Sequence, residues 1–423
     1  MNRVFILGAG ASAHAGAPLG NNIIKKYIEL KLEKLEKEKN VIGGSPVLGN
    51  SSTLSHILFT QPNCKFTHLT PLDSLREENL PNIEDVFTLY DIAYQKDEAL
   101  FYEADIDVNI IRKDILELLT YTIVHSTWGA MNQNGTTNTY QEFVDNLSIE
   151  DTIISYNYDT LLDNAIFNKF KMLNYGFDFL TIEDTIVPRP EKERQVLIRS
   201  IAEDEGISSD EVVKKYFVQR DPKINFGEDV PLLLKPHGSL NWLYCPKCYR
   251  FYCLSHKEFF ERYAFYPSEC MNYCGGNLQQ FIVPLTHHKN YQNPILNNMW
   301  MRVTQQLSTA EEVFFIGYSM PDADYSSKYY FIKGLTRPNR RNCAKLILIS
   351  PNANDSGLSN KFISIFGDIS EIIDHHEYEE VELPIGKQPI KVKQIKEEKY
   401  KYGEKKFKVI EKKFEDWIKL IKL

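Results

Sequence analysis

The stretch Val4-Phe5-Ile6-Leu7-Gly8-Ala9-Gly10-Ala11-Ser12 places four bulky apolar residues directly before a run of glycine and other small residues. Four consecutive apolar residues are typical of a parallel strand that is buried on both faces. Gly8 and Gly10 would let the backbone approach a phosphate, whose charge is met by N–H groups at the start of a following helix. The stretch therefore predicts a buried first strand that leads into a phosphate loop. A tight turn without a ligand is the alternative, since short Gly-x-Gly matches are common.

This loop differs from the pattern of the hydride-transferring dehydrogenases at two positions. Ala13 stands where that pattern has a third glycine, which is a tolerated change. The pattern also requires an acidic residue at the end of a second strand, about 20 residues further on. The candidate, Glu29, lies in the lysine-rich run 25–39, which has the spacing of a helix. We therefore expect a dinucleotide but not a dehydrogenase.

Composition and charge narrow the class of protein. A chain of 423 residues is too long for one simple core, so we expect one large α/β unit with inserted or appended modules. The net charge of −8 argues against general nucleic-acid binding. The start Met1-Asn2-Arg3 leads directly into the first strand, and no apolar run approaches 18 residues. These features predict a cytoplasmic protein that does not enter a membrane.

Five short apolar runs alternate with helical stretches along the chain, and each ends in polar or glycine-rich residues. This alternation predicts a doubly wound parallel sheet of the α/β class. Polar residues just beyond the carboxyl ends of such strands lie where open α/β sheets bind their ligands. The five predicted strands are Val4–Leu7, Asp151–Ser155, Leu232–Leu234, Val313–Ile316 and Lys345–Ile349.

Two pairs of cysteines lie between the third and fourth predicted strands. Cys245 and Cys248 are separated by two residues, and Cys270 and Cys274 by three. Two such turns can present four thiolates to one tetrahedral zinc ion, which leaves no position for a catalytic water. The pattern predicts a structural zinc site, with the nearby Cys253 as an alternative ligand. The isolated Cys64 and Cys343 are expected to be ordinary thiols.

Four motifs, taken in order, resemble those of one family. They are Gly8–Ser12 followed by Ala15-Gly16-Ala17-Pro18, then Tyr156-Asn157-Tyr158-Asp159, then His237-Gly238, and then Gly317-Tyr318-Ser319. Over roughly residues 1 to 355 the chain resembles the sirtuin family, and specifically the bacterial sirtuin-like NAD-consuming proteins of antiphage defence. The cysteine pairs fall where that family has its zinc module.

The resemblance implies a Rossmann-like NAD-binding domain, a zinc-ribbon module and cleavage of the bond between nicotinamide and ribose. It implies NAD-binding by residues 1–20, 151–242 and 284–383, a helical insertion at 21–150, and the zinc-ribbon at 243–283. It maps the family's catalytic roles to Asn157, Asp159 and His237. The candidate cofactor-binding residues are Gly8, Ala9, Gly10, Ser12, Pro18, Tyr156, Gly317, Ser319 and Asn352.

Each catalytic candidate has a plainer interpretation when taken alone. Asn157 and Asp159 could cap the following helix, and His237 could be a turn residue. His237 has a side chain that can exchange a proton near neutral pH, and Asn157 could hold a water or a ribose hydroxyl. Their combination with the phosphate loop favours the catalytic interpretation.

The sequence departs from the protein-deacylating sirtuins near the acceptor. Leu19-Gly20 replaces their Phe-Arg, Tyr156 replaces a glutamine, and residues 279–288 lack their Phe-Gly-Glu segment. These departures favour water as the acceptor, and therefore an NAD+ hydrolase, over an acyl-lysine peptide. An NAD-dependent deacylase and a non-catalytic sensor of NAD or ADP-ribose are the alternatives.

The C-terminal segment 384–423 carries 13 Lys against 6 Asp and Glu, a balance of +7. From Phe407 onward its apolar spacing predicts an amphipathic helix that packs on the body or on another chain. The family resemblance implies a homo-oligomer that could work with a hexameric translocase-type ATPase, and the tail helix is one candidate interface.

Overall fold

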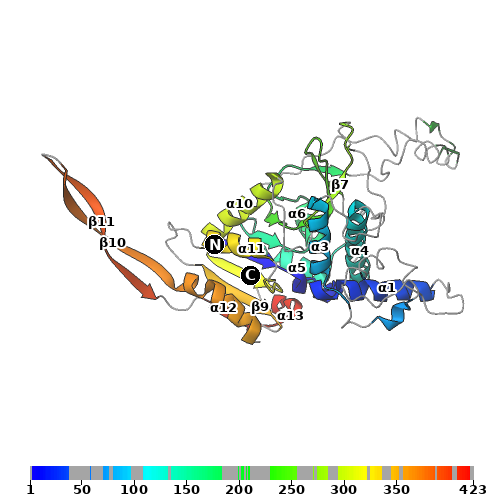
Figure 1. Cartoon of the computed structure of the whole chain (residues 1–423), viewed down its shortest axis with the longest axis horizontal. Coiled ribbons are helices and arrows are strands. Elements are labelled where there is room, and N and C mark those ends of the chain that lie inside the picture. The colour runs from blue at the N-terminus through cyan, green and yellow to red at the C-terminus, as the bar shows by residue number, and fades with distance from the viewer. Residues whose placement is uncertain are drawn as a thin grey trace.

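The structure is a computed structural model of the 423-residue chain (Figure 1). It describes residues 2–37, 58, 70–75, 80–96, 108–131, 135–182, 199, 202–203, 206, 208–209, 229–254, 270, 274–283, 294–321, 324–335, 344–351, 356–385, 388–402 and 407–419. Asn352, Cys64 and Cys343 lie outside the described residues. In the described part of the chain, no helix combines the length and the apolar character that crossing a membrane requires.

The main sheet contains six strands, all parallel, in the order β12-β9-β8-β1-β2-β4. Five of them confirm the strands predicted from the sequence. Four consecutive apolar side chains of β1 are fully buried, as expected for a central strand with β2 on one side and β8 on the other. The strands are β1 (Arg3–Leu7), β2 (Thr152–Ser155), β4 (Leu232–Leu234), β8 (Glu312–Ile316), β9 (Lys345–Ser350) and β12 (Phe407–Glu411).

Helices cover both faces of this sheet, which confirms the doubly wound α/β class. Phe314 and Phe315 are neighbours on β8, so their side chains point to opposite faces. Phe314 packs against Trp417 of the C-terminal helix, and Phe315 packs against Phe331 and Phe362. The covering helices are α5 (Asn138–Asp145), α6 (Leu161–Phe170), α10 (Pro294–Thr309), α11 (Tyr325–Leu335), α12 (Ser356–Glu371) and α13 (Phe414–Ile418).

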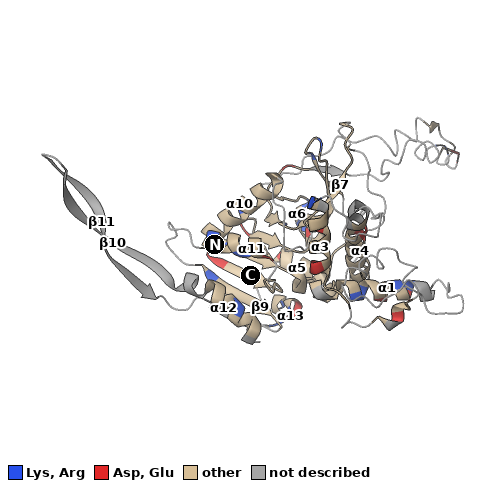
Figure 2. Cartoon of the chain, viewed as in Figure 1, with Lys and Arg blue, Asp and Glu red and all other residues tan. Residues whose placement is uncertain are grey.

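A second apolar cluster belongs to the helices between β1 and β2. These are α1 (Ile23–Lys37), α3 (Ile83–Lys96) and α4 (Val108–Trp128), which gather on one side of the molecule in Figure 1. The helix spacing predicted for α1 is confirmed, because Ile23, Ile24, Tyr27 and Ile28 are buried. Blue and red residues lie along the same helix in Figure 2, and Lys26 and Glu29 form an ion pair of 3.2 Å. Helix α5, which also lies between β1 and β2 in the chain, belongs to the main core instead.

A smaller sheet, formed by one strand before β4 and three after it, supports the cysteines. Its order is β3-β6-β5-β7, with β3 (Leu180–Ile182), β5 (Gly238–Tyr244), β6 (Phe251–Leu254) and β7 (Gln279–Ile282). Strand β5 is antiparallel to both β6 and β7. Trp242 is fully buried among aromatic rings, including those of Phe177 and Phe251. This packing fixes the sheet beside the main core.

The C-terminal segment differs from the single helix predicted from Phe407. Two long antiparallel strands, β10 (Ile372–Ile385) and β11 (Gln388–Tyr402), pair with each other as a separate two-stranded sheet and extend from the body in Figure 1. The chain then returns as β12 beside β9, and helix α13 begins only at Phe414. The prediction of a helix over 407–411 was wrong because the exposed edge of β9 offers a complete ladder of backbone hydrogen bonds, which outweighs local apolar spacing.

We expect the C-terminal segment to stabilise the fold. Phe414 and Trp417 are both 3 % exposed in the main core, so Phe414→Ala should lower the free energy of unfolding by about 3–5 kcal/mol. Urea unfolding measures this change, and Lys419→Ala, at an exposed position of the same tail, is the matched control. An unchanged free energy in Phe414→Ala contradicts the expectation. A changed mass in light scattering would point to the tail as an interface between copies.

Candidate functional site

A cavity of about 770 Å³ lies at the carboxyl ends of β1, β2, β8 and β9. This is the edge of a parallel sheet where open α/β proteins bind ligands. The wall contains eleven of the predicted catalytic and cofactor-binding residues. They are Gly8, Ala9, Gly10, Ser12, Pro18, Tyr156, Asn157, Asp159, His237, Gly317 and Ser319.

The loop after β1 lies directly against the end of β8. The N–H of Gly8 donates to the carbonyl of Ile316 at 3.0 Å, and the N–H of Gly10 donates to that of Gly317 at 2.9 Å. A Cβ on Gly10 would lie 2.8 Å from Gly317 Cα. The small residues of the loop are therefore needed for contact between two strand ends as well as for approach to a ligand.

The helix expected directly after the loop does not form there. Two short 3₁₀ turns, Ala9–Ala11 and Ala13–Ala15, follow β1, and the first long helix begins only at Ile23. Gly16, with φ of +83°, ends the second turn. A ligand phosphate would therefore meet a compact loop of two 3₁₀ turns instead of the first turn of a long helix.

The Ser12 hydroxyl joins the loop to three other side chains. It donates to Asp159 Oδ2 at 2.8 Å and accepts from Asn157 Nδ2 at 2.9 Å. Its third contact is the hydroxyl of Tyr140 at 2.7 Å, which must be the donor because Ser12 has only one proton to give. Two of the predicted catalytic residues are thus held against the phosphate loop by one buried hydroxyl.

Buried charges lie immediately behind this hydroxyl. Burial raises the pKa of Asp159, while the positive charge of Lys235 acts to lower it. Asp159 Oδ1 also accepts from the N–H of Leu161 at 3.1 Å, so the same carboxylate satisfies the first N–H of helix α6 from the residue before the N-cap Thr160. The ammonium of Lys235 donates to the carbonyl of Asp159 at 2.7 Å, to Asp163 Oδ2 at 2.9 Å and to Ser239 Oγ at 2.7 Å.

His237 lies in the turn between β4 and β5 and is 4 % exposed. Because Lys235 contacts Ser239, one hydrogen bond spans the turn that carries this histidine. The ring of Tyr156 meets the imidazole edge-on at 4.8 Å and stacks on Tyr318 at 4.8 Å. His237 Nε2 lies 3.6 Å from Asp324 Oδ2. The imidazole is therefore held between aromatic rings and one carboxylate at the cavity wall.

The structure adds residues to the wall that the sequence did not indicate. Asn82 and Glu84 come from the start of α3, where Asn82 Oδ1 accepts from the N–H of Glu84 at 3.0 Å. Lys413, Phe414 and Glu415 come from the C-terminal segment. Asp324 could have been suspected, since an acid follows the end of a predicted strand. The others had no signal, because they do not follow any strand that the sequence predicted.

The C-terminal segment reaches the cavity through Phe414. Its ring lies 6.1 Å from that of His14, 5.6 Å from that of Tyr140 and 5.5 Å from that of Phe143. Tyr140 is the same residue that donates to Ser12. The C-terminal helix α13 therefore packs against the loop residue His14 and against Tyr140, which holds Ser12.

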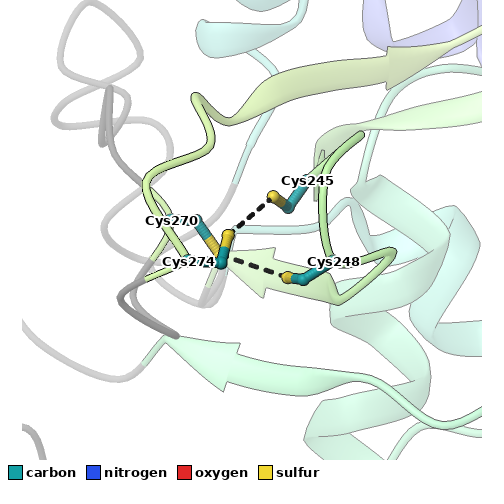
Figure 3. Close-up of side chains that lie close together, drawn as sticks. All are labelled: Cys245, Cys248, Cys270 and Cys274. Carbon is teal, nitrogen blue, oxygen red and sulfur yellow. Dashed lines mark hydrogen bonds between the residues drawn. The ribbon is translucent and has the colours of Figure 1, made fainter.

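The four predicted zinc ligands gather at one point of the smaller sheet (Figure 3). Their sulfur atoms all lie within 4.8 Å of one another, with Cys245 Sγ 3.5 Å from Cys274 Sγ and Cys248 Sγ 3.6 Å from Cys270 Sγ. Burial acts to raise the pKa of Cys245, but backbone N–H groups of the knuckle outweigh it and lower the pKa to about 7. A group of four such thiols could hold a metal ion, and its chemistry fits zinc.

Cys253, the alternative ligand, lies in a different environment. Its thiol is buried, burial raises its pKa, and its sulfur accepts from Asn241 Nδ2 at 3.2 Å. It is not a member of the four-thiol group. The structure therefore separates the ligand candidates that the sequence could not.

We expect the loop to depend on glycine at position 317. Gly317 has φ of +56°, and a Cβ there would lie 2.4 Å from the nitrogen of Ala11. Gly317→Ala should therefore lower the free energy of unfolding by more than about 1 kcal/mol, seen as a lower thermal midpoint. Gly129→Ala, where a Cβ would meet nothing within 4 Å, should change it by less than about 0.5 kcal/mol. Equal effects of the two substitutions would contradict this account.

We expect metal content to follow the four-thiol group. The purified protein should carry about one zinc per chain by elemental analysis, and Cys248→Ser or Cys270→Ser should abolish it because a four-thiolate shell needs all its ligands. Cys253→Ser should retain the metal. Loss of zinc in Cys253→Ser, with retention in Cys248→Ser, would reverse the assignment.

No protein-family model matches the sequence, and no curated protein matches it. Solved structures of Sir2 enzymes are similar in structure. A Sir2 homologue in complex with NAD is 12 % identical, with 87 % of this chain and 89 % of that chain covered and a TM-score of 0.35. A complex of Sir2 with a p53 peptide and NAD+ is 10 % identical, with 86 % and 93 % covered and a TM-score of 0.33. A likeness this distant does not define the activity of the present chain.

Proposed function

We propose that this protein is an NAD+ hydrolase, which cleaves the bond between nicotinamide and ribose and releases ADP-ribose. The observation that carries the proposal is the shared wall of one cavity. A small-residue loop suited to a pyrophosphate and the side chains of Asn157 and His237 line the same space, and Ser12 of that loop accepts a hydrogen bond from Asn157. A cavity of about 770 Å³ is within the range of pockets that enclose ligands of this size.

Each end of the cavity suits a different part of the dinucleotide. The close-packed backbone of Gly8, Gly10 and Gly317 would face the pyrophosphate, with Ser319 beside it. Asn157, fixed through its Nδ2 by Ser12, would orient a ribose hydroxyl or a water. His237 would accept the proton that the attacking water loses. Nicotinamide leaves as a neutral molecule, so these residues need not supply a strong acid.

Water is the acceptor that we propose. Tyr156 stands where deacylating sirtuins have a glutamine, and its ring is packed between His237 and Tyr318. A bulky aromatic group next to the base reduces the room for a peptide side chain while leaving room for a water. The absence of the Phe-Gly-Glu segment after the second cysteine pair supports the same choice.

The cellular role that we propose rests on the motif resemblance alone. We propose a cytoplasmic defence protein that depletes NAD+ during phage infection, as an abortive-infection response. Such an activity must be restrained in a healthy cell, which is consistent with a homo-oligomer that is controlled by assembly or by a hexameric translocase-type ATPase.

The proposal predicts release of nicotinamide from NAD+ by the purified protein, alone or with candidate activators. His237→Ala should reduce the rate by about 100- to 10,000-fold, because it removes the proton acceptor. Asn157→Ala should also reduce it strongly, since the amide that orients the nucleophile is lost. His125→Ala and Asn146→Ala, at positions outside the cavity wall, are the matched controls and should retain the activity. Nicotinamide is measured by chromatography.

The same assay separates the alternatives. If nicotinamide is released only when an acyl-lysine peptide is present, the protein is a deacylase and not a hydrolase. Binding of NAD or ADP-ribose in calorimetry, with the ligand recovered unchanged under every condition, would indicate a sensor. If the wild type and both variants release no nicotinamide, and the wild type binds neither NAD nor ADP-ribose, an NAD-directed function is refuted.

A further inference from the structure

A buried carboxylate outside the four sequence motifs faces His237 across the cavity wall. Asp324 directly precedes α11, lines the cavity and is 2 % exposed. Its Oδ2 lies 3.6 Å from His237 Nε2. A fully buried carboxylate is costly unless it is hydrogen-bonded or paired, so its position next to the imidazole calls for a physical reason.

Two hydroxyl groups donate hydrogen bonds to this carboxylate. The Tyr318 hydroxyl donates to Asp324 Oδ2 at 2.9 Å, and Ser327 Oγ donates to the same oxygen at 2.5 Å. The N–H of Asp324 donates to the carbonyl of Pro321 at 3.0 Å. Hydroxyl donors stabilise a carboxylate and disfavour its protonation. The carboxylate is therefore fixed in place from both the strand end that carries Tyr318 and the helix that carries Ser327.

The distance between the two residues defines what the carboxylate can do. The distance of 3.6 Å between His237 Nε2 and Asp324 Oδ2 exceeds that of a hydrogen bond, so Asp324 contributes little stabilisation to a neutral imidazole. An opposite charge within about 4–6 Å does favour the protonated ring. Protonation of either ring nitrogen produces the same positive imidazolium, so this stabilisation does not depend on which nitrogen receives the proton.

Among the described residues, the other contacts of His237 include aromatic rings and a backbone N–H. Tyr156 and Tyr158 contribute rings at 4.8 Å and 6.3 Å, and the carbonyl of His237 accepts from Val283 N–H at 2.9 Å. Lys235, two residues earlier, directs its ammonium to Asp163, Ser239 and the carbonyl of Asp159. The carboxylate oxygens of Asp159 accept from Ser12 and from the N–H of Leu161.

We propose that Asp324 is a positioning residue that acts through His237, by stabilising the imidazolium formed when His237 takes a proton. The inference rests on the proposed NAD+ hydrolysis. In that reaction an O–H bond of water breaks, and its electron pair forms the new bond to ribose C1′. The bond from C1′ to the nicotinamide nitrogen breaks with its pair remaining on nicotinamide, and the proton goes to His237. Asp324 stabilises the charge at that last step.

The test uses the full chain and a readout that does not need activity. The His237 imidazole is followed by NMR of histidine-labelled protein, and its signal is identified by its loss in His237→Gln. In Asp324→Asn the midpoint of the His237 titration should move to lower pH by about one unit, a tenfold change in protonation, because the neighbouring negative charge is gone. Asp145→Asn, which neutralises an exposed carboxylate elsewhere, should leave the midpoint unchanged.

Kinetics provide the second readout. Asp324→Asn should lower kcat for nicotinamide release by about 10- to 100-fold with little change in KM. The acid limb of its pH profile should move to lower pH together with the NMR midpoint. Asp324→Glu, which retains the charge, should recover part of the rate. Loss of the rate without any movement of the pH profile would show a merely structural residue.

The outcomes separate the two proposals. An unmoved His237 midpoint in folded Asp324→Asn overturns the inference. If that variant does not fold, Asp324→Ser removes the charge while keeping a residue favoured at the start of a helix, and the same midpoint decides. If the His237 midpoint moves in Asp324→Asn but the wild-type protein never releases nicotinamide, the pairing of Asp324 with His237 is established and the proposed NAD+ hydrolase is overturned instead.

Discussion

The hydroxyl of Ser12 is the interaction on which the geometry of the site depends. With one donated and two accepted hydrogen bonds it uses its full capacity. Its partners are Tyr140 of α5 and the pair Asn157 and Asp159 after β2, all at least 128 residues away from Ser12 in the chain. Because the group is buried, any partner that moved away would leave an unsatisfied polar atom. The loop after β1 and the residues after β2 are therefore fixed relative to each other before a ligand arrives, which is a condition for efficient catalysis.

Backbone contact on the other side of the loop completes this arrangement. Gly10 donates to the carbonyl of Gly317, and neither position has room for a Cβ. The ends of β1 and β8 are thus joined directly through their backbones, and the Ser12 side chain joins the end of β1 to the residues after β2. The space that remains is polar backbone at one end and, at the other, the aromatic rings of Tyr156 and Tyr158 beside His237. A dinucleotide needs both environments, because its pyrophosphate is charged and its nicotinamide is a flat ring.

Buried ions extend the same principle to the histidine. Lys235 and Asp163 pair at 2.9 Å with both side chains at most 1 % exposed, and the ammonium also contacts Ser239 on the far side of His237. Removing one member of such a pair would leave an uncompensated charge, which usually costs about 3–5 kcal/mol. The turn that carries His237 is therefore rigid, and the imidazole meets Asp324 at a fixed distance. Stability and the proposed proton transfer therefore both depend on this turn.

The sequence by itself determined the α/β class, five of the six strands of the main sheet and the residues at their ends. These follow from local apolar runs and from the rule that parallel strands share one ligand-binding edge. It also indicated the paired cysteines, whose spacing is local. Only the tertiary structure decided that Phe407–Glu411 is a strand, that Tyr140 and Phe414 support the phosphate loop, that Cys253 stands apart from the four thiols, and that Asp324 faces His237. Those are contacts between segments distant in sequence, and no local pattern records which distant edge or side chain a segment will meet.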